Sequence, residues 1–158
     1  MTSTITAATL TVTLTEAISL NGYDQGSKNT LTVDSVTEVS KRLVTVTTSE
    51  ATIATFSAAV AAGNYIAANV RYIRFTNKDD TNFITLTFRN QDNDEVAIKL
   101  DYGQSIILNG DNANGMTAIF NATEDADAAS STNFGSLTNI QADADTASVD
   151  LEIFIASA

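Results

Sequence analysis

The run from Val70 to Asn109 reads VRYIRFTNKDDTNFITLTFRNQDNDEVAIKLDYGQSIILN. Within it, apolar side chains alternate with polar ones over residues 70–77, 83–90, 95–100 and 104–109, which is the period of a half-buried β-strand. The intervening residues 78–81, 91–94 and 101–103 are rich in Asp, Asn and Gly, which favour turns. The run therefore predicts consecutive antiparallel strands that are joined by short loops.

The alternation also assigns a face to each side chain. We expect the core to contain Ile73, Phe75, Ile84, Leu86, Phe88, Val96, Ile98 and Leu100, with Leu151, Ile153 and Ile155 from a last strand over 149–155. The opposite faces then carry Tyr72, Arg74, Thr85, Thr87, Arg89, Lys99, Asp150 and Glu152. Because a sheet with one apolar face needs a second layer to cover it, the pattern predicts two packed sheets.

The N-terminal third also alternates, with threonine between aliphatic residues. Residues 9–20 predict one long strand or two short ones, and Asn21-Gly22 predicts a tight turn after them. Further strands are expected over 31–36 and 43–48. The alternating frame slips near Lys41-Arg42, which predicts a turn or a bulge there.

Two segments lack this pattern. The alanine-rich residues 57–68 predict either a short helix that ends at Gly63 or an irregular crossover, and the polar residues 121–135 predict a long surface loop. A chain of 158 residues is long enough for one domain. The sequence thus predicts an all-β, antiparallel, jelly-roll-like sandwich that forms a single domain over residues 1–158.

The composition excludes several classes of function. Cysteine, histidine, tryptophan and proline are all absent, so a His-based triad, a Cys nucleophile or an ordinary zinc or haem site cannot form. The net charge of -11 argues against a phosphate-binding surface, and no apolar stretch is long enough for a membrane span. We therefore expect no enzymatic activity, no cofactor or metal, and no nucleic-acid or membrane partner.

Arg74, Arg89 and Lys99 are the notable cations. If their three strands are neighbours, these side chains cluster on one face of an acidic molecule and form a contact for an acidic partner surface. The alternative is a cross-strand ladder in which they pair with Asp101, Asp150 or Glu152.

Acidic groups offer two weaker patterns. Asp150 and Glu152 lie two positions apart on one strand, so their Cα atoms are about 6.5–7 Å apart, which overlaps the separation of the two carboxyl groups in inverting glycosidases. Residues 90–95 supply oxygen ligands for Ca²⁺ but do not match an EF-hand, so a solvated β-turn is the other interpretation.

Two stretches resemble a known group of proteins. Residues 10–48 (LTVTLTEAISLNGYDQGSKNTLTVDSVTEVSKRLVTVTT) resemble the opening of small virion structural proteins of marine tailed bacteriophages, including cyanophages. Residues 70–108 resemble their middle segment, in which a Tyr-Ile-Arg strand leads to a turn and an Ile-Lys-Leu strand precedes a Gly-x-Ser hairpin. Residues 137–155 fit as the last strands, whereas 49–69 and 110–136 match only loosely.

The resemblance implies a non-enzymatic particle component. We expect a capsid decoration or cement protein that binds the major capsid protein, self-associates as a homo-oligomer, and resides in the virion after assembly in the host cytoplasm, since no secretory signal is visible. The alternatives are a tail, neck or fibre-base component, which would bind tail proteins, and a carbohydrate- or Ca²⁺-binding attachment module.

Overall fold

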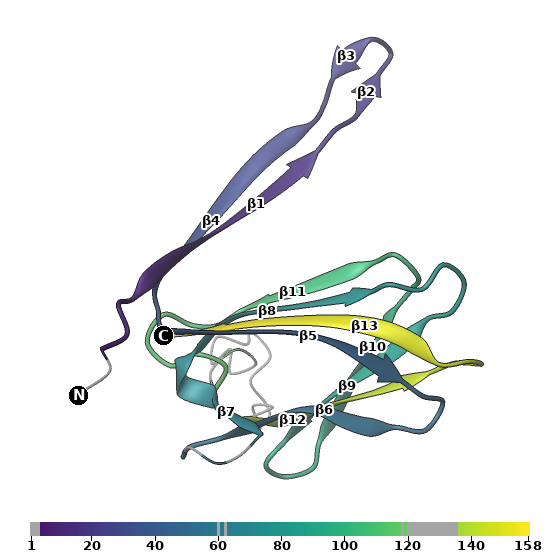
Figure 1. Ribbon diagram of the computed structural model, residues 1–158. Helices are drawn as coiled ribbons and strands as arrows, with labels where there is room; N and C mark the ends of the chain where they lie inside the picture. The colour runs from purple at the N-terminus through teal and green to yellow at the C-terminus, as the bar shows by residue number, and fades with distance from the viewer. Residues whose placement is uncertain (1–3, 60, 62, 118, 120–135) are drawn as a thin grey trace, which may run out of the picture.

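The computed structural model describes residues 4–59, 61, 63–117, 119 and 136–158. One sheet has the strand order β11-β8-β13-β5 and the other has the order β10-β9-β12-β6-β7. The strands of the first sheet span Ser105–Asn109, Val70–Asn77, Val149–Ser157 and Glu38–Val46. Those of the second span Glu95–Leu100, Ile84–Asn90, Leu137–Ala144, Ala51–Ser57 and Asn64–Ile66. The two sheets face one another as the layers of a sandwich (Figure 1).

The predicted fold class is confirmed: the molecule is an all-β sandwich. Neighbouring strands are antiparallel except for β6 and β7, which pair in parallel. The predicted core residues of β8, β9 and β13 are buried, as is Leu100 of β10. Val96 was expected in the core but is 41% exposed, because β10 is an edge strand and Val96 lies near its outer end.

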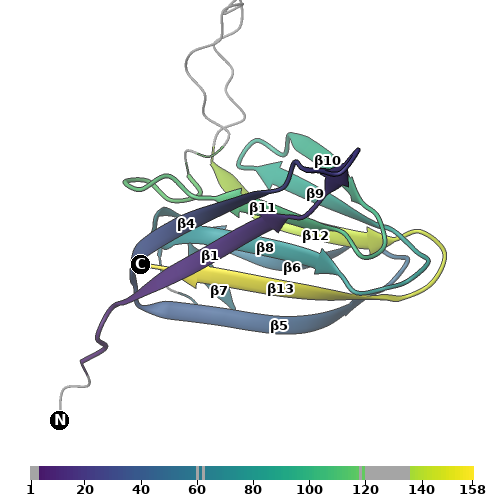
Figure 2. The same cartoon turned by 90° about the horizontal axis from the view of Figure 1, so that it is seen from above.

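The N-terminal strands leave the sandwich altogether. Strands β1 (Ala8–Glu16) and β4 (Ser27–Val36) pair only with each other, and β2 (Ser19–Leu20) and β3 (Tyr23–Asp24) form the tip of the same hairpin. We call residues 8–36 the arm. It rises from the sandwich at the end where the C-terminus lies and points away from it (Figure 1), and from above it crosses the sheet β11-β8-β13-β5 (Figure 2).

Local chemistry explains the shape of the arm. The predicted turn forms at Asn21 and Gly22, which both have positive φ, 52° and 82°, as a tight two-residue hairpin turn requires. At the base, the β1–β4 register shifts between Ala8 and Leu10, opposite Ser35, whose φ is 61°. This bulge precedes Thr37, which separates β4 from β5.

A small second core holds the base of the arm. Val33, Val36, Tyr72 and Ala156 are buried together, and Leu10, Val12, Leu31 and Phe154 pack against them. The Tyr72 ring meets the Phe154 ring edge to face, with centroids 5.9 Å apart. Tyr72 was expected on a solvent-facing surface; the base of the arm covers it instead, which desolvates its hydroxyl and raises its pKa.

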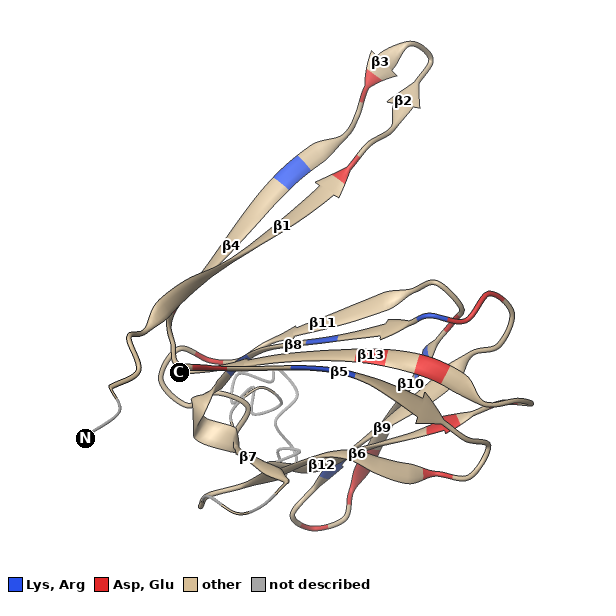
Figure 3. Ribbon diagram, in the orientation of Figure 1, with Lys and Arg blue, Asp and Glu red and all other residues tan. Residues whose placement is uncertain are grey.

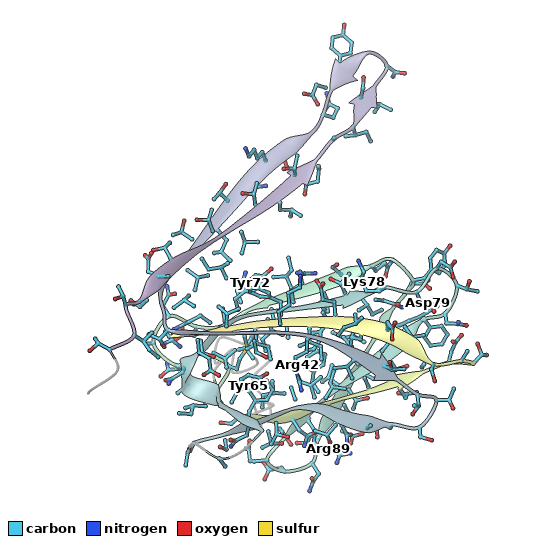
Figure 4. All side chains as sticks on the ribbon, in the orientation of Figure 1. Arg42, Tyr65, Tyr72, Lys78, Asp79 and Arg89 are labelled. Carbon is cyan, nitrogen blue, oxygen red and sulfur yellow. The ribbon has the colours of Figure 1, made fainter. Side chains whose placement is uncertain are left out.

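The predicted turn or bulge near Lys41-Arg42 is wrong. Strand β5 runs unbroken in register with β13, and the chain breaks at Thr37 instead. The frame slips in the sequence because Arg42, although exposed at the edge strand, lies on the same face of β5 as Val44 and Val46. Its guanidinium donates to the carbonyl of Ile53 at 2.6 Å, where the register between β6 and β12 shifts. Arg42 therefore links the two sheets along one side of the sandwich (Figure 4).

Segments with weak patterns contain further differences. Residues 57–68 form no α-helix: they hold the end of β6, the short β7 and the start of a 3-10 turn over Ala67–Asn69, with residues 60 and 62 outside the described part. Strand β6 was not predicted, and β12 only through the resemblance. The predicted loop over 121–135 lies outside the described residues.

One end of the sandwich is closed by the turn from Asp111 to Gly115. The Met116 N–H donates to the Ala67 carbonyl at 2.8 Å, and Met116 is fully buried. A Cβ on Gly115 would lie 2.4 Å from that same carbonyl oxygen, and Gly115 also has a φ of 57°. Only glycine fits there without displacing the backbone.

Phe75→Ala is expected to lower the free energy of unfolding by about 3–5 kcal/mol, because Phe75 is fully buried between the sheets and its removal leaves a cavity. Tyr102→Ala, at an exposed turn, is the control and is expected to change it by less than about 0.5 kcal/mol. Urea unfolding followed by circular dichroism measures both. Equal losses would contradict the assignment of the core.

Candidate interaction surface

The three cations that the sequence singled out do not form one cluster. Arg74 lies on β8, in the sheet beneath the arm, whereas Arg89 and Lys99 lie on β9 and β10 of the other sheet. All three alternate with core residues and point outward, so Arg74 is on one outer face of the sandwich and the other two are on the opposite face. Figure 4 shows Arg89 on the side away from Tyr72 and the arm.

Each of these cations has an acidic neighbour. The Nε of Arg89 lies 2.7 Å from Oε1 of Glu95, and the Nζ of Lys99 lies 3.6 Å from Oδ2 of Asp101 and 4.3 Å from the centre of the Phe83 ring. The alternative prediction, a cross-strand ladder with Asp101, Asp150 or Glu152, is confirmed for Arg74 with Glu152. Lys99 does pair with Asp101, but two residues further along its own chain segment, and Arg89 pairs across strands with Glu95, which was not predicted. Surface pairs of this kind contribute little stability.

The strongest electrostatic cluster centres on Glu152. Nη2 of Arg74 lies 2.6 Å from its Oε1, and Nζ of Lys41 lies 3.3 Å from its Oε2. The hydrogen bond from Arg74 is the largest effect and holds the pKa of the Glu152 carboxyl below its usual value. Burial opposes it with a smaller effect, and the hydrogen bond from Lys41 lowers the pKa further. Arg74 also bonds the hydroxyl of Thr76, so it is fixed from two sides.

This cluster does not suit acid catalysis. Asp150 and Glu152 do share the outer face of β13, as their spacing predicts, but Asp150 accepts a hydrogen bond from Thr45 and Glu152 is bound by two cations. A general acid that protonates a leaving group needs a raised pKa, whereas the pKa of Glu152 is lowered. The pair is therefore arranged as part of an ion-pair network.

The Asp- and Asn-rich loop after β9 is a hairpin turn. The side-chain oxygen of Asn90 accepts the N–H groups of Asp92 and Asp94 at 2.9 and 2.7 Å, and Asn93 has a φ of 65°. In the part of the chain that the structure describes, no group of three acidic residues is placed to hold a metal ion.

The arm presents two chemically different faces. Register places Leu10, Val12 and Leu14 on the same face as Val33, Leu31 and Asn29, and it places Thr11, Thr13 and Thr15 on the other face with Thr32, Thr30 and Lys28. Charged residues are sparse along the arm (Figure 3). The apolar face is buried only at the base: Leu14, Ile18, Leu20 and Tyr23 are 51–73% exposed.

A wedge opens between the arm and the sheet beneath it. At its narrow end is a cavity of about 340 Å³ lined mainly by Val12, Leu14, Leu31, Tyr72 and Ile107. Beyond this cavity the outer face of the sheet is largely polar around Glu152, with Leu43 of β5 as an exposed apolar residue among polar ones. The apolar face of the arm and this polar sheet face thus diverge from a common buried base.

Sequence reasoning missed the arm. Its strands alternate as regularly as those of the sandwich, so nothing in their pattern distinguishes a free ribbon from a core strand. The signal that the sequence does offer is its composition. From residue 9 to residue 15 every second residue is threonine, and the apolar positions after Glu16 lead directly into the Asn-Gly turn.

Comparison of the chain with family models, with curated proteins and with solved structures finds no match. Among the described residues, no helix is long and apolar enough to cross a membrane.

The ion pairs of Glu152 predict a pH-dependent stability. A carboxyl whose pKa is lowered by folding stabilises the native state above its usual value of 4.5, and this contribution disappears as the pH falls through that value to the lower native one. Glu152→Gln is therefore expected to be less stable than the wild type by up to about 1 kcal/mol at pH 7, and by progressively less as the pH falls below 4.5.

Urea unfolding at a series of pH values measures this difference. Asp150→Asn is the control, since Asp150 lies on the same strand face but makes no ion pair in the described structure. A wild-type advantage over Glu152→Gln that stays constant from pH 7 to pH 3 would contradict the role of Arg74 and Lys41.

Proposed function

We propose that this protein is a non-enzymatic structural component of a tailed-phage particle, and specifically a decoration protein that binds the outside of the capsid shell. Three things support the proposal: the resemblance of residues 10–48 and 70–108 to small virion proteins of marine phages, the compact sandwich, and the arm. The tail or neck remains the other location within the same class.

The arm is the observation that carries the proposal. A two-stranded hairpin is marginally stable alone in water, and the distal half of this one exposes Leu14, Ile18, Leu20 and Tyr23 without packing on the sandwich. Exposed apolar side chains that are gathered on a projecting element favour contact with another chain. Such an element is expected of a protein whose role is assembly.

The charge distribution is compatible with an outer position. A net charge of -11 keeps the chain away from packaged DNA and keeps it soluble at high concentration. Because Arg89 and Lys99 lie on the sheet face opposite the arm, we assign that face to the shell and leave the arm for other contacts. Arg74, on the arm side, is then not a shell contact.

The first test is the number of copies per purified particle, measured by quantitative mass spectrometry against the major capsid protein. A decoration protein is expected at one copy per shell subunit or at a simple fraction of that number. A handful of copies would place the chain in the tail or neck and would overturn the decoration role. Absence from particles would overturn the virion assignment and favour an attachment module.

The second test addresses the shell-facing surface. Arg89→Glu combined with Lys99→Glu is expected to weaken binding to particles stripped of this protein by at least about tenfold, because two cations are replaced by anions against an acidic partner surface. Lys78→Glu combined with Thr48→Glu makes the net charge more negative by three units, against four for the first pair, at exposed positions elsewhere, and is the control. Equal losses for both double variants would show that only net charge matters and would contradict the assignment.

A further inference from the structure

Among the described residues, none covers the apolar face of the distal arm. Val33 and Val36 at the base are buried against the sandwich, but the same face continues outward past Leu14 and Glu16 to Leu20, and both leucines are more than half exposed. The strands nevertheless remain paired from the base to Glu16 and Ser27, and again at the tip. An ordered ribbon with an exposed apolar face is suited to contact a second surface, and the two together form an interface.

The other half of such an interface is the same face on the arm of another copy. The cavity at the narrow end of the wedge has a mostly apolar lining, and beyond it the outer face of the sheet is largely polar around Glu152, with Leu43 and Ile107 exposed. Since the arm and the sheet diverge, one copy does not close the wedge between them. A second copy that is related by a two-fold axis offers an arm to each wedge.

Charge also favours a second copy. Lys28 lies on the threonine face of the arm, and Asp150 lies toward the far end of the sheet face below. In the described structure neither side chain has an ion-pair partner; Asp150 only accepts a hydrogen bond from Thr45. When the arm of another copy lies in the wedge with its apolar face against the resident arm, its threonine face and Lys28 turn toward the sheet and its carboxylates.

We propose that this protein self-associates by reciprocal exchange of arms. Each arm enters the wedge of the other copy, packs Leu14, Ile18 and Leu20 against the same face of the resident arm, and places Lys28 beside Asp150 of the other sheet. The occupant of the wedge is thus a second copy of this chain. The inference is independent of the phage assignment, because it rests on the arm and the wedge alone.

The first test is the mass of the purified full-length chain by light scattering and sedimentation. The wild type is expected at twice the chain mass of 16.7 kDa. Leu14→Asn combined with Leu20→Asn is expected to shift it to a monomer, with dissociation at least about tenfold easier. Val96→Asn combined with Tyr102→Asn removes exposed apolar groups on other elements and is expected to leave the dimer unchanged. A monomeric wild type would overturn the proposal.

Geometry is tested by cross-linking, which the absence of cysteine makes clean. Leu14→Cys is expected to form a disulfide-linked dimer under mild oxidation, and Tyr102→Cys is not. Comparable cross-linking of both variants would indicate random collision and would overturn the assigned contact.

Orientation is tested by charge reversal. Lys28→Asp and Asp150→Lys are each expected to weaken the dimer, and the double variant is expected to restore it, because two-fold exchange brings the reversed charges together again. A double variant weaker than both single variants would overturn docking in the wedge.

None of these assays uses particles, so their failure is distinct from failure of the proposed function. If the wild type is a monomer, and a separate particle-binding assay shows that Leu14→Asn with Leu20→Asn loses binding, then the shell and not a second copy occupies the wedge.

Discussion

The contact between the two sheets is the constraint on which the rest of this structure depends. Each strand of the sandwich has an apolar face, and the side chains of Phe75, Phe88 and Ile153 are removed from water only when β8 and β13 face β9 and β12 across a common core. Burial of each such side chain contributes about 1.5–3 kcal/mol, far more than any surface pair described here. The positions of the charged groups follow from this packing.

The arrangement of cations illustrates that dependence. Because β8 and β9 follow each other in the chain but belong to different sheets, Arg74 and Arg89 are carried to opposite faces of the molecule. On one face Arg74 joins Lys41 around Glu152. On the other face Arg89 pairs with Glu95 of the neighbouring strand, and Lys99 pairs with Asp101 in its own chain segment. A chain with so few cations therefore has two modest positive sites, each already partly neutralised, instead of one basic patch.

The arm also has an apolar face, but only its base is covered. Its base is held by a small core in which Val33 and Val36 meet Tyr72 and Ala156, and this core fixes the direction in which the hairpin leaves the sandwich. Beyond that point no described residue forms a second layer over the apolar face of the ribbon. The sandwich strands find their cover within the chain, whereas the outer part of this ribbon finds none among the described residues, which is why the arm carries the proposals on assembly.

What the sequence determined by itself is the local structure: the strands of the middle and C-terminal regions, the Asn21-Gly22 turn, and the inward faces of β8, β9 and β13, since alternation and turn chemistry are properties of neighbouring residues. The tertiary structure alone decided the rest. Arg74 and Arg89 are separated because their strands belong to different sheets, and Tyr72 is desolvated because the arm buries it. The position of Arg42 is explained only by its hydrogen bond to the Ile53 carbonyl of the other sheet. An alternating pattern indicates that one face of a strand needs a cover, but it does not indicate which element provides it, and for the outer part of the arm no described element does.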